Sequence, residues 1–323
     1  MNPKKSDLGD RGAVLAEILG HLEDTAQSLS FHRLTGLSDL GHDEVILFVT
    51  TWSRISAERK CAVLGHLQEL AEDNVIYDFS AVFKHALTDA DSTVRQKAIE
   101  GLWENNEPSL ILPLLRILTK DNTPAVREAA AIALGRFAIL AECQQIEAAN
   151  IAQLSQPLLA IANNPGEPIP LRCRALEAAS PLSLADVTQA IWAAYRCLES
   201  EMCISALRAM GLNRDLLWLP TIIQELSNDN PEVRYAAAEA AGALGEAEAT
   251  PNLIELLDDP DPEVKLSAVQ ALGNIGGSEA KNALVRLLRH QDQPLREAAT
   301  QALAEIELYE KPFSPPTNER PEP

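Results

Sequence analysis

The sequence predicts an all-α protein, an alpha-alpha superhelix (solenoid) of about seven to eight stacked helical hairpins. The first observation is a segment that occurs in three similar copies, NDNPEVRYAAAEAAGA at 228–243, DPDPEVKLSAVQALGN at 259–274 and HQDQPLREAATQALAE at 290–305. Its apolar anchors, Val233, Val264 and Leu295, are 31 residues apart. A fixed period of this length indicates stacked supersecondary units instead of one globular core.

The second observation is that each period contains signals for two helices. Asn230, Asp261 and Asp292 are suited to cap the second helix, because their side chains accept amide protons of its first turn. Ala268 and Ala271, four and seven residues after an anchor, share one helical face and let a neighbouring helix approach closely. Leucines and isoleucines at helical spacing predict the preceding first helix. The third observation, an aromatic content of 4%, suits layers rich in alanine and leucine.

The repeat continues toward the N-terminus. Equivalent anchors stand at Met202, Leu171, Val126 and Val94, and 57–67 is a degenerate copy. Val126 and Leu171 are 45 residues apart, so roughly 13 residues are inserted, at about 141–160. The predicted organisation is a disordered N-terminus, a helical cap that includes the degenerate repeat, the repeat array and a disordered Pro-rich tail. Their ranges are 1–8, 9–87, 88–308 and 309–323.

The repeated pattern D-x-D-x-x-V-R-x-x-A-x-x-A-L-G resembles the HEAT repeat, and more narrowly the short bacterial HEAT-like repeats of the phycobilisome-lyase type. The residues that carry the resemblance are Asp89, Val94, Arg95 and Ala98; Asp121, Val126, Arg127, Ala130, Leu134 and Gly135; and Asp259, Val264, Lys265, Ala268, Leu272 and Gly273. The resemblance covers about 85–310. It is specific for fold and not for function, because HEAT arrays occur in scaffolds, lyases, chaperones and a few enzymes.

A cation follows most anchors. In resembling HEAT proteins each such arginine pairs with Asp or Asn in the turns, since a guanidinium group matches a carboxylate well. We therefore expect a structural ladder, with the alternative of a basic column that binds an acidic ligand. Cys203 replaces the arginine in one unit, so the ladder should be interrupted there. The ladder residues are Asp89, Arg95, Asp121, Arg127, Arg172, Arg234, Asp259, Lys265 and Arg296.

The net charge of −20 limits the classes of partner. Nucleic acids and anionic membranes are disfavoured as partners, whereas a protein with a basic patch would be attracted.

No apolar run reaches transmembrane length. The five cysteines are odd in number and lack C-x-x-C spacing, which favours reduced thiols in a cytoplasmic protein. The resemblance implies that the protein is bacterial. We expect a monomer.

In resembling proteins the second helices line the concave face. The residues that project from these helices mix both signs of charge, with acidic residues more common. This pattern predicts a non-catalytic scaffold or adaptor that binds a partner protein on its concave face, with a solvated helix face as the alternative. The predicted partner-binding residues are Glu100, Arg136, Arg174, Glu177, Arg208, Glu239 and Gln270.

The resemblance also implies a second function, that of a bilin lyase or a chaperone-like factor for pigment-protein assembly. Cysteines and aromatic residues within 170–235 would then contact the ligand; they are Cys173, Cys197, Cys203, Trp192, Tyr195, Trp218 and Tyr235. The same residues would also suit as buried gap-fillers. There is no H-E-x-x-H, no His-Glu dipeptide of the HEAT hydroxylases and no phosphate-binding loop. We expect no catalytic residue, cofactor or metal site, and enzymatic activity, if present, would be lyase-like.

Overall fold

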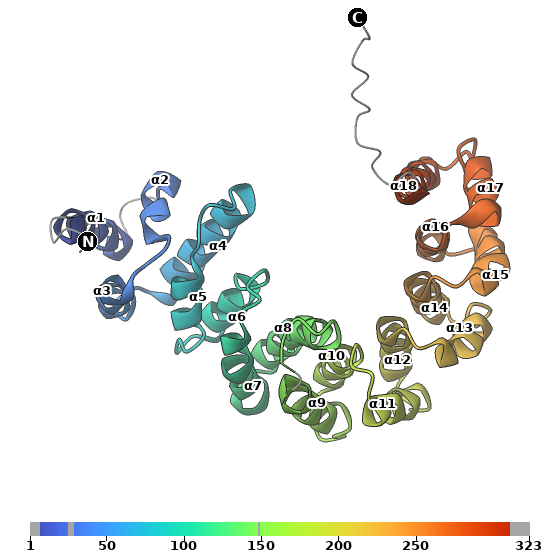
Figure 1. Cartoon of the computed structure of the whole chain (residues 1–323), viewed down its shortest axis with the longest axis horizontal. Coiled ribbons are helices and arrows are strands. Elements are labelled where there is room, and N and C mark those ends of the chain that lie inside the picture. The colour runs from blue at the N-terminus through green and yellow to red at the C-terminus, as the bar shows by residue number, and fades with distance from the viewer. Residues whose placement is uncertain (1–6, 25–28, 148, 311–323) are drawn as a thin grey trace, which may run out of the picture. The chain divides into compact units, whose positions relative to one another are not determined.

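The chain is built from helices throughout its described part (Figure 1). The computed structural model describes residues 7–24, 29–147 and 149–310. Within these ranges no residue lies in a β-strand, as the all-α prediction requires. The ends that we expected to be disordered, 1–8 and 309–323, fall mostly outside the described residues. The first helix, α1, begins at Asp7, and the last, α18, ends at Glu310.

The chain forms two compact units, Met1–Phe137 and Ala138–Pro323. In the first unit an N-terminal segment precedes three helical hairpins, α3/α4, α5/α6 and α7/α8. The N-terminal elements are α1 (Asp7–Glu23), α2 (Phe31–Leu34) and η1 (Thr35–Leu37). The hairpin elements are α3 (His42–Trp52), α4 (Ala57–Asp73), α5 (Ser80–Ala86), α6 (Ser92–Glu100), η2 (Pro108–Leu110), α7 (Ile111–Lys120) and α8 (Pro124–Glu142).

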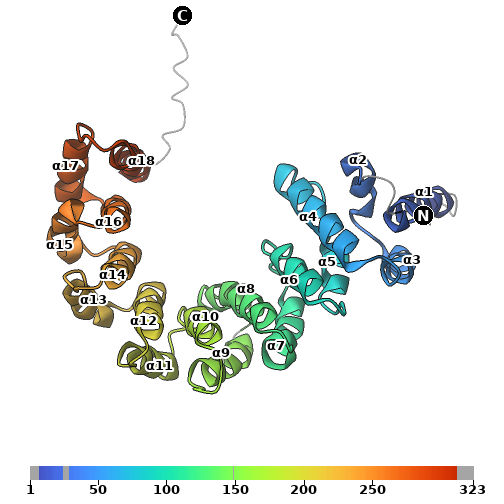
Figure 2. The same ribbon diagram turned by 180° about the vertical axis from the view of Figure 1, so that it is seen from behind.

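The second unit contains five hairpins. In both views its second helices, with even numbers, line the inner side of the curve that this unit forms, and the first helices line the outer side (Figures 1 and 2). The elements are α9 (Ala149–Ala162), α10 (Ile169–Ala179), α11 (Ala185–Tyr195), α12 (Ser200–Asn213), η3 (Leu216–Trp218), α13 (Leu219–Glu225), α14 (Pro231–Leu244), η4 (Ala247–Ala249), α15 (Thr250–Glu255), η5 (Leu256–Asp258), α16 (Pro262–Ile275), α17 (Gly277–Leu287) and α18 (Gln293–Glu310).

The anchor residues occupy equivalent buried positions in the second helices from α6 to α18. Each is at most 6% exposed, and the set is Val94, Val126, Leu171, Met202, Val233, Val264 and Leu295. Ala268 on α16 and Ala237 on α14 are fully buried, so small side chains do meet between neighbouring second helices. The described residues thus form eight hairpins, and the predicted solenoid is confirmed.

Capping side chains in the turns set the first residue of the second helices. The Asn230 side chain accepts the amide of Glu232 at 2.9 Å, and the Asp261 side chain accepts the amide of Glu263 at 2.9 Å. Asp292 directly precedes α18. The Asn230 and Asp261 side chains satisfy amide groups of the first turn that have no partner within the helix. The turns therefore fix the starting residue, and with it the face that each helix buries.

The long spacing between Val126 and Leu171 is taken up by helices. α8 has 19 residues and α9 has 14, whereas the corresponding helices of two consecutive later hairpins, α14 and α15, have 14 and 6. The additional residues therefore lengthen the second helix of one hairpin and the first helix of the next.

Candidate protein-binding surface

Two ladder arginines join consecutive hairpins through the same set of hydrogen bonds. The Nε and Nη2 atoms of Arg95 donate to the Asp121 carboxylate at 2.7 and 2.8 Å, and Arg234 contacts Asp259 at the same distances. In each case Nη1 donates to two carbonyl oxygens of the turn before its own helix. Each arginine therefore fixes its own turn and the turn of the next hairpin, with donors in the planar arrangement that suits a carboxylate.

Other predicted ladder cations contact the backbone. Arg296 donates to the carbonyl oxygen of His290 at 2.7 Å, Arg127 to that of Leu118 at 2.7 Å, and Arg172 to that of Ala162 at 3.2 Å. Lys265 lies near enough to Asp259 for its charge to help lower the pKa of that carboxyl group.

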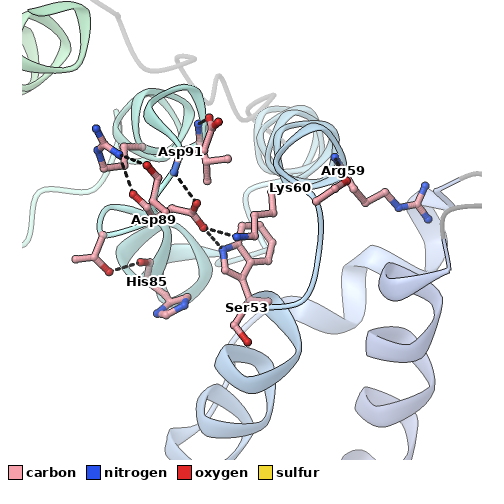
Figure 3. Close-up of polar contacts among 12 residues, drawn as sticks. Ser53, Arg59, Lys60, His85, Asp89 and Asp91 are labelled. Atoms are coloured by element: carbon pink, nitrogen blue, oxygen red, sulfur yellow. Dashed lines mark hydrogen bonds and ion pairs between the residues drawn. The ribbon is translucent and has the colours of Figure 1, made fainter. Parts of the chain in front are cut away.

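The ladder begins one hairpin earlier than the sequence motif indicated (Figure 3). The Asp89 carboxylate accepts hydrogen bonds from Lys60 Nζ at 2.7 Å, from Trp52 Nε1 at 2.9 Å and from the amide of Asp91 at 3.1 Å. Burial raises the pKa of Asp89, but these hydrogen bonds outweigh it and the net shift is downward. Lys60 thus pairs with Asp89 as Arg95 pairs with Asp121. Its position within the degenerate copy at 57–67 was the signal that could have marked it as a ladder residue.

The unit that lacks the arginine also lacks its acidic partner. Cys203 stands in the arginine position, and Asn228 stands where Asp121 and Asp259 stand as partners of Arg95 and Arg234. The buried Glu225 accepts hydrogen bonds from Tyr195 Oη at 2.5 Å and from Asn228 Nδ2 at 2.6 Å. A different polar network therefore links the helices here.

Among the cysteine and aromatic residues of 170–235, Cys173 and Trp218 are buried, and the other five are half-buried. Cys173 and Tyr235 line the groove described below. Trp218 is fully buried, its indole donates to Asn213 Oδ1 at 2.8 Å, and its ring lies 5.0 Å from that of Trp192. Burial raises the pKa of the Cys173 and Cys203 thiols. A raised pKa disfavours the thiolate, which is the nucleophilic form.

A groove of about 770 Å³ opens among the second helices of the second unit, and we call it the unit 2 groove. Its lining combines apolar side chains such as Ile204 with a charged rim. Three predicted partner-binding residues line it, namely Arg174, Glu177 and Arg208. Arg174 forms an ion pair with Glu177 at 2.6 Å, and Arg208 forms one at 3.4 Å with Glu239, a predicted residue outside the lining. Gln270 is exposed on α16 and is not part of the lining.

A second groove, of about 680 Å³, lies among α4, α6 and α8 of the first unit. We call it the Trp103 groove, after a side chain that is 54% exposed. The predicted residues Glu100 and Arg136 line it, together with Ile132. Arg136 Nη2 donates to the carbonyl oxygens of Leu102 at 3.1 Å and Asn105 at 2.6 Å, so part of this guanidinium group stabilises the turn after α6.

The family follows from the repeats themselves. The family model for HEAT repeats matches residues 80–165 and 219–304, which together make up more than half of the chain. The chain belongs to the HEAT repeat family. The motif that suggested the resemblance is therefore a true family motif, and no curated protein matches the sequence.

Among solved structures, Kap95p supports the fold of this HEAT repeat protein. Kap95p, from a structure with RanGDP, is 13% identical over 92% of this chain and 46% of its own, with a TM-score of 0.51. The complex of CpcE and CpcF of phycocyanin lyase from Nostoc sp. PCC7120 is 16% identical over 88% and 97%, with a TM-score of 0.49. Escherichia coli YibA is 17% identical over 78% and 98%, with a TM-score of 0.44. At 13% identity the likeness to Kap95p shows the fold alone.

The sequence did not single out Trp103 as a site residue of this HEAT repeat protein. Trp103 follows the end of α6 and stands nine residues after the Val94 anchor, where other repeats have Gly135, Gly211, Gly242 and Gly273. A tryptophan at this glycine position was an available signal. Ile132 lies six residues after the Val126 anchor, on the outward face of α8, and is 60% exposed. An apolar residue at a position where other repeats carry Glu100, Glu177 or Glu239 was the signal that could have marked it.

Proposed function

We propose that this HEAT repeat protein is a non-catalytic scaffold or adaptor that binds a partner protein along its second helices. The observation that carries the proposal is that each unit has a groove lined by its second helices, with apolar side chains in its lining and charged side chains at its rim. Protein interfaces combine an apolar centre with a polar rim in the same way. Solenoid proteins commonly bind through such extended surfaces.

The charges of the unit 2 groove favour a partner with a basic patch. Its two arginines, Arg174 and Arg208, are both held in ion pairs within this chain. The lining also contains five acidic residues, Glu177, Glu201, Glu232, Asp261 and Glu263. Together with a net charge of −20, this excess of carboxylates would steer a basic protein toward the groove and repel phosphate-rich ligands.

Two further observations bear on where the protein acts. Among the described residues, no helix has the combination of length and apolar character needed to span a bilayer. All five cysteines are free thiols, including the exposed Cys143. Free thiols fit a reducing compartment, which supports the cytoplasm as the place of action.

The geometry gives no separate support to the alternative of a bilin lyase or a chaperone-like factor for pigment-protein assembly. Cys173 lines the unit 2 groove but is 8% exposed, and burial raises the pKa of its thiol. Trp192 and Trp218 pack on each other instead of framing an open cavity. We therefore keep this alternative as an outcome of the experiment below.

The test is affinity capture from the lysate of the native host at low and moderate salt, with mass spectrometry and an absorption spectrum of the eluate. The scaffold proposal predicts one dominant protein, lost as salt rises, and no visible absorbance. Hydrogen exchange of the complex should then show protection in α10, α12 and α14. A coloured eluate would favour the pigment-protein alternative, and an eluate without a specific protein would contradict both functions.

A further inference from the structure

Trp103 differs from the other tryptophans of the chain in its exposure. Trp52 and Trp218 are at most 1% exposed and each donates its indole N–H to a carboxylate or amide oxygen, whereas Trp103 is 54% exposed. Ile132, on the neighbouring helix α8, is 60% exposed and lines the same groove. Large apolar side chains that gather on a surface mark interaction sites, and tryptophan is prominent among residues that dominate binding energy.

Each of the three helices around this groove contributes a carboxylate. They are Glu72 on α4, Glu100 on α6 and Glu128 on α8. Gln68 donates to one oxygen of Glu72 and Gln96 to one oxygen of Glu100, both at 3.0 Å. The amide hydrogen bonds orient these two carboxylates, and each keeps a second oxygen that can accept a donor from outside.

The one cation in the groove lining is anchored to the backbone and is outnumbered by the three carboxylates. Arg136 is the one cation among the lining residues, and its Nη2 atom already donates to the carbonyl oxygens of Leu102 and Asn105. Its guanidinium carbon also lies 5.2 Å from the centre of the Phe137 ring. The groove therefore offers an incoming chain an apolar surface and carboxylate oxygens.

We propose that the Trp103 groove is a docking site for a short basic segment of a partner protein. An aliphatic side chain of the segment lies against Trp103 and Ile132, and a flanking lysine or arginine pairs with Glu100 and Glu128. Desolvation of the exposed indole provides affinity, and the carboxylates select for charge. An acidic segment, a nucleic acid or an anionic lipid surface would be repelled. This inference rests on the proposed scaffold function and names the chemistry of its partner.

The experiment selects peptides from a displayed random library on the full-length protein and measures their affinity for variants. Trp103→Ala removes the apolar anchor, and Ile132→Lys introduces a positive charge at an exposed helical site. We expect the selected peptides to share an aliphatic residue flanked by lysine or arginine. Each variant should weaken their binding at least about tenfold, which is the effect typical of a central interface residue.

Matched controls come from the same unit. Leu112 on α7 is 64% exposed and lies outside the Trp103 groove, so Leu112→Ala and Leu112→Lys make equivalent changes elsewhere. Both should bind the peptides like the unmodified protein. Thermal unfolding of all four variants should match that of the unmodified protein, since all the substituted side chains are exposed.

Selection of acidic peptides, selection of none, or unchanged affinity for Trp103→Ala would overturn the inference. Peptides that keep their affinity for Trp103→Ala but lose it with Glu201→Lys would bind in the unit 2 groove. In that case the docking site inferred here would be wrong while the scaffold function survives. Failure of the scaffold function itself is seen separately, in the capture experiment with the unmodified protein.

Discussion

Gly242 on α14 lies against the backbone of Ala271 on α16. A Cβ atom added to Gly242 would be 2.8 Å from the Cα atom of Ala271, closer than side-chain carbons approach a backbone in ordinary packing. The same relationship joins Gly211 to Ala240, also at 2.8 Å. In each case a glycine nine residues after one anchor meets an alanine seven residues after the next, so the hairpins stack at the distance that these two small residues allow.

Gly242→Ala should destabilise the protein by about 1–3 kcal/mol, although alanine is the better helix former, because the added methyl group would push two helices apart. Gly65→Ala in α4 is the matched control, since a Cβ atom there meets nothing within 4 Å. That substitution should be neutral or stabilising. Urea unfolding followed by circular dichroism measures both, and equal effects would contradict the close approach.

Ala268→Glu should destabilise by about 3 kcal/mol or more, because the side chain at this fully buried position would carry a charge between two layers. Gln270→Glu, two residues along the same helix, is exposed and should change stability little. Thermal unfolding of the two variants separates the buried face of α16 from its exposed face. Near-normal stability of Ala268→Glu would mean that the repeat register is wrong.

The ladder should make stability depend on pH. Burial raises the pKa of Asp259, but hydrogen bonds from Arg234 and from the amide of Asp261 outweigh it, and the pKa is lowered on balance. The same balance lowers the pKa of Asp121 beside Arg95. A carboxyl group with a lowered folded-state pKa stabilises the fold above its unfolded-state pKa, near 3.8, and this contribution is lost as the pH falls through the folded-state value.

Asp259→Asn isolates one such group. At pH 7 the variant should be less stable by about 2 kcal/mol or more, because Arg234 loses its charged partner. As the pH falls below about 4, the difference from the unmodified protein should narrow, since the native aspartate becomes protonated as well. Urea unfolding between pH 7 and pH 3 measures the difference, and a gap that stays constant over this range would argue against the ion pair.

Two substitutions should restore the arginine–aspartate pair that is missing at Cys203 and Asn228. Asn228→Asp alone would place a second carboxylate where Asn228 now donates to Glu225 at 2.6 Å, so we expect a loss of about 1–3 kcal/mol. Adding Cys203→Arg should recover part of that loss, because the arginine and aspartate would then occupy the positions that they hold in regular rungs. A double-mutant cycle measures the coupling, and a double variant no more stable than the sum of its single substitutions predicts would contradict this account.

The periodic features of this protein could be predicted from its sequence, and the isolated ones could not. The anchors, the caps Asn230 and Asp261 and the buried Ala268 recur at a fixed spacing, so each copy supported the others. Trp103 stands nine residues after its anchor, where Gly211 and Gly242 stand in other repeats, so it departs from the pattern, and its exposure depends on the path of the chain after α6. The hydrogen bond from Trp52 to Asp89 joins residues 37 apart across a degenerate hairpin, where the motif is too weak to set the register.

The central claim is that a partner protein binds to the second helices and not to the first. The most direct measurement is a calorimetric titration of the captured partner with the unmodified protein, with Glu201→Lys on α12 and with Val285→Lys on α17. Both sites are exposed, and only Glu201 lines the unit 2 groove. We predict that Glu201→Lys weakens binding at least about tenfold while Val285→Lys leaves it unchanged. The reverse pattern would contradict the claim.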